Sequence, residues 1–223
     1  MKVKARAKVN LALDVLNKRE DGYHDLDMIM APCALYDELE IEPVSGDADL
    51  IVCTDEELPE HNTLSKTMAL LRSQFPLSSF YKITLHKGIP SQAGLGGASA
   101  DAAALLKAIN ELEGLGLSQK QLMELGARIG ADVPFCVFDA PARVRGTGDI
   151  VSPIETGWKI PVLLVKPDQG VSTPQAFALA DAEERKPLDI DIVQAALEKE
   201  DIALCIRPWT TPWRTLQSSL FLY

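Results

Sequence analysis

Three glycines, Gly94, Gly96 and Gly97, precede an alanine-rich segment that has the spacing of a helix. Glycine costs backbone entropy and adds no side-chain packing, so such a cluster needs a reason. One interpretation is a tight turn between two packed elements. The other is a loop whose amides bind an anion at the start of a helix. The segment lacks both the Gly-Lys-Ser/Thr of a Walker loop and G-x-G-x-x-G spacing, so the residues alone leave both interpretations open.

Two ionisable side chains could do chemistry beside such a loop. Asp132 lies among apolar neighbours, where an unpaired carboxylate is costly to bury, so it is either a catalytic group or part of a surface turn after a helix. Lys8 shares the polar face of a predicted strand with Asn10, and most lysines on such a face are simply solvated. His24, beside Tyr23, has no metal-ligand spacing to another histidine, so we predict no protein-bound zinc.

Composition narrows the function classes. The chain has 223 residues, 47% of them hydrophobic and 24% charged, which suits one large or two small domains. The net charge of −10 argues against a nucleic-acid partner. Four scattered cysteines predict free thiols in a reducing compartment. With no signal peptide and no apolar run of membrane-spanning length, we expect a cytoplasmic protein without a membrane partner.

Hydrophobic periodicity predicts the elements that must position these residues. Residues 2–15 alternate as a long half-buried strand, and Asp21-Gly22 marks the turn that follows it. Further strands are expected over 37–44 and 48–53 with antiparallel spacing, over 81–87, and, buried, over 158–167. Helices are expected over 62–75, after an N-cap at Ser99, over 118–130 with a Ser118/Gln121 capping box, over 172–183 and over 189–201. This order predicts an α+β fold.

Three segments together resemble one known family. They are KARAKVNLALDVLNKREDGYHDL, IPSQAGLGGASADAAALLKAIN and GADVPFCVF, in this order. They resemble the GHMP kinases over residues 2 to about 180. The resemblance implies two α+β domains: an S5-like N-terminal domain over residues 1–150 and a ferredoxin-like C-terminal domain over 151–223. The second domain would be truncated, with an atypical tail from about residue 206.

The resemblance also implies a nucleotide site. ATP would bind with Mg²⁺, and the loop amides and helix dipole would supply a positive field for its phosphates. Mg²⁺ would be held through ATP, with Ser99 as the candidate protein ligand. The residues implied to bind ATP are Pro90, Gly94, Leu95, Gly96, Gly97, Ala98 and Ser99 in the loop, with Asn62, Lys66 and Lys87 on the adenine side.

The implied activity is phosphorylation of the tertiary 2-hydroxyl of 4-diphosphocytidyl-2-C-methyl-D-erythritol, in the non-mevalonate route to isoprenoid precursors. Asp132 would act as general base, and Lys8 would keep it ionised and stabilise the developing charge. The DGYH element selects this acceptor among those of the family, because an aromatic ring can stack on cytosine and a histidine can bond its polar edge. The residues implied to bind the acceptor are Asn10, Tyr23, His24, Asp132, Thr173, Pro174 and Phe177.

The chain departs from the family pattern in three places. Ala98 and Ala100 replace a glycine and a serine of the loop, so Ser99 or Asp101 would have to supply the lost hydroxyl's role. The turn after PFC reads FDAPARVRGTG, and the late glycine-rich motif is absent. We expect a truncation or frame change after about Cys205.

Three alternatives follow: a GHMP kinase with another acceptor, a truncated form that binds nucleotide without turnover, and an S5-like RNA-binding domain, against which the negative charge argues. The expected partner is a small molecule, and the expected state is a monomer or weak homodimer.

Overall fold

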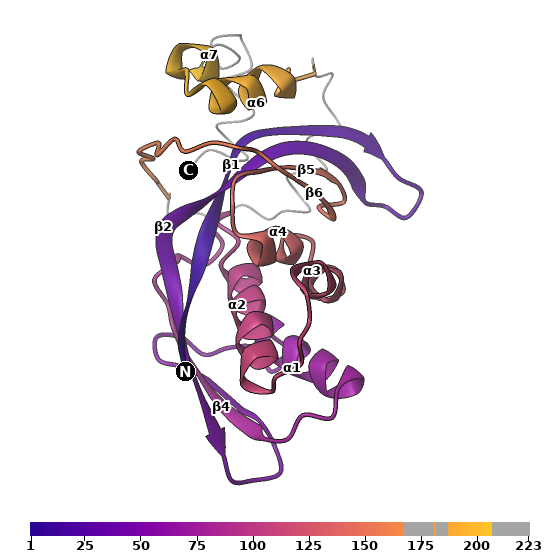
Figure 1. Ribbon diagram of the computed structural model, residues 1–223, viewed down its shortest axis with the longest axis vertical. Coiled ribbons are helices and arrows are strands. Elements are labelled where there is room, and N and C mark those ends of the chain that lie inside the picture. Colours follow the sequence, from indigo (N-terminus) through magenta and orange to yellow (C-terminus); the bar gives the residue numbers. More distant parts are fainter. Residues whose placement is uncertain (167–180, 182–186, 207–223) are drawn as a thin grey trace. The chain divides into compact units, whose positions relative to one another are not determined.

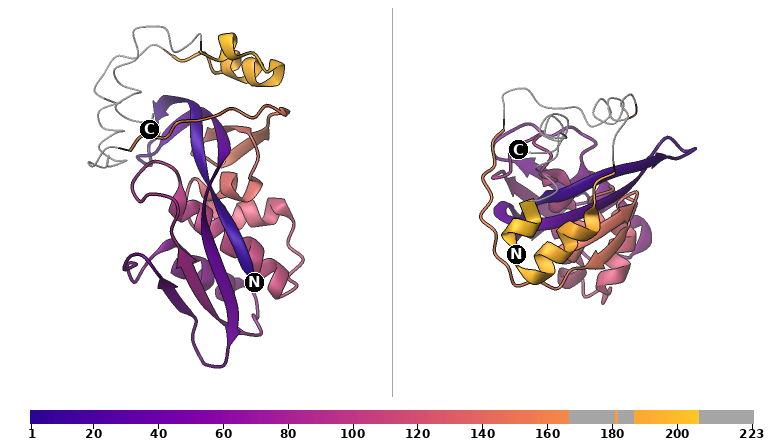
Figure 2. Two further views of the ribbon diagram at one scale, coloured as in Figure 1. Left: turned by 90° about the vertical axis from the view of Figure 1, so that its left-hand side faces the viewer. Right: turned by 90° about the horizontal axis from the view of Figure 1, so that it is seen from above.

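The computed structural model describes residues 1–166, 181 and 187–206. For residues 205 and 206 it describes the backbone alone. The chain forms two compact units. Unit 1 comprises Met1–Lys8, Pro32–Pro90 and Gly96–Asp139, and unit 2 comprises Val9–Ala31, Ser91–Leu95 and Ala140–Tyr223. Two long paired strands, β1 (Lys2–Lys18) and β2 (His24–Val44), contribute to both units (Figures 1 and 2). The units therefore interleave along the chain. The single domain boundary expected near residue 150 stays a prediction.

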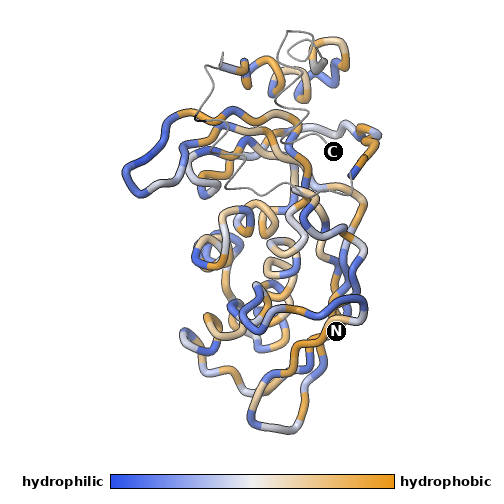
Figure 3. Tube along the Cα trace, turned by 180° about the vertical axis from the view of Figure 1, so that it is seen from behind, coloured by the Kyte–Doolittle hydropathy of each residue, from blue (hydrophilic) through white to orange (hydrophobic). Residues whose placement is uncertain are grey.

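The β1–β2 hairpin turns where the sequence predicts. The Arg19 N–H donates to the Tyr23 carbonyl at 2.7 Å, and Gly22 has φ +86°, a conformation that favours glycine. The hairpin tip is hydrophilic (Figure 3). The predicted alternation along β1 fails at Lys8, which is buried together with its neighbour Ala7.

The strands of unit 1 extend the second half of β2. β4 (Phe80–His86) pairs antiparallel with β2 from Glu38 to Val44. β3 (Leu50–Cys53) pairs with β4 in parallel, so the antiparallel expectation for residues 48–53 is wrong. The reason is α1 (Thr63–Gln74), which lies between β3 and β4 in sequence and returns the chain to the same end of the sheet.

Four helices belong to unit 1: α1, α2 (Gly97–Leu112), α3 (Gln119–Ala127) and α4 (Val133–Phe138). The capping box of Ser118 and Gln121 at the start of α3 is confirmed. Helix α2 begins earlier than predicted, because Gly96 with φ +69°, and not Ser99, is its N-cap. Seven consecutive residues of α2, from 100 to 106, are buried, which explains the small alanines that pack there.

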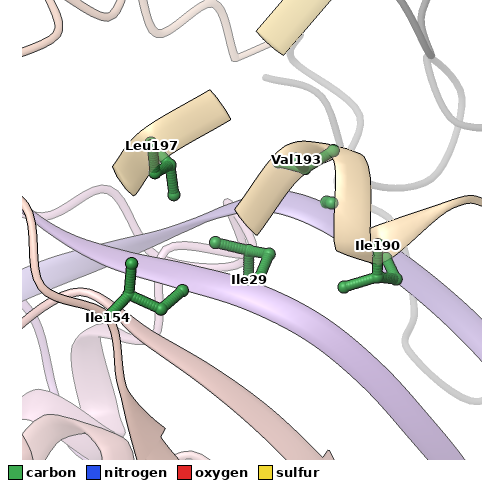
Figure 4. Packing of buried hydrophobic residues seen from close by; sticks show 6 residues of the cluster. Ile29, Ile154, Ile190, Val193 and Leu197 are labelled. Carbon is green, nitrogen blue, oxygen red and sulfur yellow. The ribbon is translucent and has the colours of Figure 1, made fainter. Parts of the chain in front are cut away.

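Unit 2 combines the first half of β2 with later elements. β5 (Ala142–Gly146) pairs antiparallel with β2, and β6 (Ile150–Pro153) pairs antiparallel with β5. Helix α6 (Ile190–Lys199), capped by Asp189, confirms the helix expected over 189–201, and α7 (Ile202–Ile206) follows. Figure 4 shows the hydrophobic cluster of this unit, in which α6 faces β2; its labelled members are Ile29, Ile154, Ile190, Val193 and Leu197.

The buried strand expected over residues 158–167 is not found. Residues 157–166 have no regular structure, and Leu163 is 85% exposed. An apolar run becomes a buried strand only between two neighbours, and no strand in the described part of the chain pairs with this one. The helix expected over 172–183 and the tail from about residue 206 lie outside the described residues, apart from Asp181 and Ile206.

Candidate active site

The start of α2 presents unused backbone donors. The first intrahelical bond runs from the Ala100 N–H to the Gly96 carbonyl at 2.8 Å. The amides of Gly97, Ala98 and Ser99 therefore have no partner within the helix, and no side chain caps it. Ala98 is exposed and Ser99 is half-buried. Together with the helix dipole, these amides can bind an anion such as a phosphate.

Lys8 crosses directly beside this N-cap. A Cβ added to Gly96 would lie 2.9 Å from Lys8 Cγ, closer than real contacts allow, so glycine is required here both for its φ and for space. The lysine is 6% exposed, although its strand face was expected to be solvated. A buried ammonium needs an anionic partner, and Lys8 Nζ lies 3.4 Å from Asp132 Oδ2.

Asp132 is held at the N-cap of α4. Its backbone carbonyl accepts from the Cys136 N–H at 3.1 Å, but its carboxylate makes no capping bond. The side chain is 32% exposed and faces the Lys8 ammonium. The expected alternatives were a catalytic group or a surface turn. The observed arrangement leaves a carboxylate that is charge-paired and still accessible, as a general base must be.

A second charge cluster lies beneath the start of α2. Asp37 Oδ2 accepts from Lys87 Nζ at 2.5 Å, and Asp101 Oδ2 lies 3.4 Å from the same ammonium. Burial, with the nearby negative charge of Asp37, raises the pKa of Asp101 to about 8, although Lys87 opposes this. Burial alone would lower the pKa of Lys87, but the charges and hydrogen bonds of the two carboxylates raise it.

Sequence reasoning missed Asp37 in this cluster and assigned Asp101 another role. Asp101 was a candidate to replace the lost loop hydroxyl, but its side chain is 4% exposed and lies on Lys87. Ser99 is therefore the better placed of the two, with its Oγ near Gly130. The sequence did offer a signal for Asp101. This aspartate lies within a run of alanines, at a position where the helical spacing predicts burial.

Asn62 and Lys66, two of the residues predicted to lie on the adenine side, both belong to α1 or its N-cap. Asn62 caps α1, since its Oδ1 accepts from the Ser65 N–H at 2.9 Å and its Nδ2 donates to the Pro59 carbonyl. Lys66 is exposed on the same helix. Pro90, at the start of the loop, is also exposed.

The predicted acceptor residues that are described lie in unit 2. Tyr23 is 64% exposed, which leaves its ring free to stack on a ligand. His24 is buried, with Nε2 2.7 Å from Asp181 Oδ1, and Asp181 also accepts from Lys18 Nζ at 2.8 Å. The Oδ1 of Asn10 is buried without a hydrogen-bond partner among the described residues.

The other predicted site residues lie in unit 2 or outside the described residues. Gly94, with φ +69°, and the buried Leu95 belong to unit 2. Thr173, Pro174 and Phe177 lie outside the described residues.

In the described part of the chain, no group of three His, Cys, Asp or Glu residues could hold a metal ion. None of the described helices is long and apolar enough to cross a membrane.

Comparison with known proteins identifies the family. Residues 62–140 match the model of the GHMP kinases N terminal domain. The 4-diphosphocytidyl-2-C-methyl-D-erythritol kinase of Caldicellulosiruptor bescii is 40% identical over 205 residues, which cover 91% of this chain and 72% of the relative. The chain belongs to the GHMP kinase family. The Geobacillus thermodenitrificans protein of the same name is 41% identical to this GHMP kinase over 93% of the chain and 72% of the relative.

Solved structures agree with this assignment. A crystal structure of 4-(cytidine 5'-diphospho)-2C-methyl-D-erythritol kinase matches 90% of the chain and 72% of its own, with 31% identity and a TM-score of 0.69. The structure of Streptococcus pneumoniae phosphomevalonate kinase matches 99% of this chain and 80% of its own, with a TM-score of 0.69. Its sequence identity of 13% means that this match shows the fold alone. The predicted α+β fold of the family is thus confirmed. As a GHMP kinase, the chain uses ATP as phosphate donor and acts on a small molecule.

Proposed function

We propose that this GHMP kinase transfers the γ-phosphate of ATP to the tertiary 2-hydroxyl of 4-diphosphocytidyl-2-C-methyl-D-erythritol. The observation that carries the proposal is the buried Lys8 ammonium, which lies 3.4 Å from Asp132 and against the Gly96 N-cap of α2. It links a candidate base to a candidate phosphate cradle. The acceptor is taken from the relatives named above, at about 40% identity.

The chemistry assigns one role to each group. Asp132 accepts the proton of the hydroxyl as its oxygen attacks phosphorus, which matters most as the transition state forms. Lys8 pairs with the carboxylate of Asp132 and stabilises the charge that develops on the transferred phosphoryl group. The amides of residues 97–99 hold the phosphates. Phosphoryl transfer depends mainly on such positioning and charge stabilisation.

Mg²⁺ is proposed as the cofactor that accompanies ATP. Mg²⁺ prefers oxygen ligands, and in some nucleotide-binding loops a serine or threonine hydroxyl helps to hold it beside the substrate phosphates. The half-buried Ser99 hydroxyl fits that description, whereas Asp101 is occupied by Lys87. When bound, the ion would neutralise charge on the phosphates.

The acceptor is assigned to unit 2 residues. The exposed ring of Tyr23 can stack on cytosine. His24 is proposed to bond the polar edge of the base, although its ring is buried and its Nε2 lies 2.7 Å from Asp181 Oδ1. The buried Asn10 Oδ1 is an acceptor suited to a substrate hydroxyl. Phe177, with Thr173 and Pro174 beside it, is proposed as a second stacking ring. We further propose a cytoplasmic protein that is a monomer or weak homodimer.

A panel of acceptors tests the proposal. ADP release would be measured with Mg-ATP and 4-diphosphocytidyl-2-C-methyl-D-erythritol, homoserine or phosphomevalonate as acceptor. We expect release above background only with the first. Turnover with another acceptor would favour a different GHMP kinase, and nucleotide binding without any turnover would favour an inactive form.

A further inference from the structure

Asp37 gathers three donors at the end of β4. It is fully buried on β2, and its Oδ1 accepts from the backbone N–H groups of Gly88 and Ile89, each at 2.7 Å. Its Oδ2 accepts from Lys87 Nζ at 2.5 Å. The segment that leads into the glycine loop is therefore bonded to the sheet through one carboxylate.

Lys87 joins this segment to α2. Its ammonium also lies 3.4 Å from Asp101 Oδ2, and the side chain is 14% exposed. Charged hydrogen bonds between buried groups are strong and directional, and removing one partner leaves the others uncompensated. The ammonium thus ties the end of β4 to the second turn of the helix.

The first residue of α2 rests on the same cluster. A Cβ added to Gly97 would lie 3.4 Å from Lys87 Nζ and 3.5 Å from Asp37 Oδ2. The Cγ2 of Ile89, whose own N–H donates to Asp37, is also 3.3 Å from this position. Because these side chains pack directly against the backbone, we expect a displacement of the lysine to shift the Gly97 amide. This amide is one of the three that open α2.

We propose that Asp37, Lys87 and Asp101 are positioning residues that hold the α2 amides in place for the phosphates of ATP, and that Lys87 does not contact the nucleobase. The inference rests on the proposed function, because the ligand is the phosphate chain of ATP. Asp101 Oδ1 is buried without a hydrogen-bond partner in the described residues, a cost in stability that a purely structural cluster has no reason to keep.

Binding of Mg²⁺ with a non-hydrolysable ATP analogue to the full chain tests this, measured by calorimetry. Lys87→Met and Asp101→Leu should each raise the Kd about tenfold, because small displacements of positioned groups are costly. Asp101→Asn keeps the shape and polarity and should bind within about twofold of the wild type. In turnover assays, Asp101→Leu should raise the KM for ATP and leave that for the acceptor unchanged.

The matched control is Arg72→Met, which breaks a second charge pair of unit 1 in which Arg72 Nε lies 2.6 Å from Asp49 Oδ2. It should lower thermal stability without changing the Kd. The inference is overturned if Asp101→Leu binds the ATP analogue as tightly as Arg72→Met does. If only Lys87→Met then bound weakly, Lys87 would contact the nucleotide directly and would not be a positioning residue. The inference is also overturned if Asp101→Asn binds as weakly as Asp101→Leu. A wild-type chain that binds no nucleotide would instead remove the proposed function itself.

Discussion

Lys8 Nζ lies 3.4 Å from Asp132 Oδ2, and the lysine is buried while the aspartate remains partly open to solvent. The two residues are far apart in sequence and come from β1 and from the start of α4. The asymmetry suits their proposed roles. A buried cation provides a strong, fixed field, and an accessible carboxylate can reach a substrate hydroxyl.

Lys8→Met should lower kcat by a factor of about 100 to 1,000, because one preorganised charge at the developing oxyanion is removed. Steady-state kinetics would check this, with circular dichroism to confirm folding. Lys4→Met is the control, since Lys4 is exposed on the same strand. A Lys8→Met enzyme with the turnover of Lys4→Met would contradict the assigned role.

Gly96→Ala should reduce both stability and turnover. Its φ of +69° strains any L side chain, at about 1–2 kcal/mol, and the new Cβ would meet Lys8 Cγ at 2.9 Å. Gly114→Ala has a similar φ of +61° and nothing within 4 Å of its Cβ. Thermal denaturation should show a loss of stability in both variants, larger in Gly96→Ala because of the clash with Lys8. The kcat should fall about tenfold only in Gly96→Ala. Equal kcat values in the two variants would mean that the conformation of the α2 N-cap does not affect phosphoryl transfer.

Tyr23→Ala should raise the KM for the acceptor about tenfold and leave the KM for ATP unchanged. The ring is 64% exposed, so its loss should hardly affect stability, and base–aromatic stacking contributes about 1–3 kcal/mol. Tyr23→Phe keeps the ring and should restore binding. If Tyr23→Phe is as impaired as Tyr23→Ala, the contribution comes from the hydroxyl and the stacking role fails.

Glu113 provides a pH-dependent contribution to stability. Burial would raise its pKa, but donors from Tyr81, Ser78 and Ser79 lower it to about 2. Because the folded pKa lies below the unfolded one near 4.3, the stabilisation is present above that value and is lost as pH falls toward 2.

Glu113→Gln should therefore lower the free energy of unfolding by about 2 kcal/mol at pH 7, a figure that is already reduced because the side chain is partly exposed. At pH 3.5 the loss should be smaller. Urea midpoints at both pH values would measure the difference, with the exposed Glu111→Gln as control. A pH-independent difference would rule out the ionised carboxylate as its source.

Local patterns predicted much of the fold. The hairpin turn at Asp21-Gly22 and the capping box at Ser118 depend on neighbouring residues only, and both are found. The N-cap of α2 was misplaced, because Ser99 has the better capping side chain whereas Gly96 has the backbone freedom that the approach of Lys8 requires. The contact with Lys8 is tertiary and leaves no local signal.

The site was predicted in its residue types but not in its environment. Alternation placed Lys8 on a solvated face, because a period of two does not reveal the distant elements that cover this lysine or the carboxylate that pairs with it. The run over 158–167 misled for the same reason: apolar composition predicts burial, but pairing partners decide it. Asp37 escaped notice because only the fold brings it to Lys87.

The most direct test of the central claim is a single-turnover measurement with the wild type and Asp132→Asn. Both would be saturated with Mg-ATP and 4-diphosphocytidyl-2-C-methyl-D-erythritol, and phosphorylated product would be followed by rapid quench. We expect Asp132→Asn to bind the ATP analogue within about threefold of the wild type but to form product at least about 100 times more slowly. Product formation at the wild-type rate would contradict the assignment of Asp132 as general base.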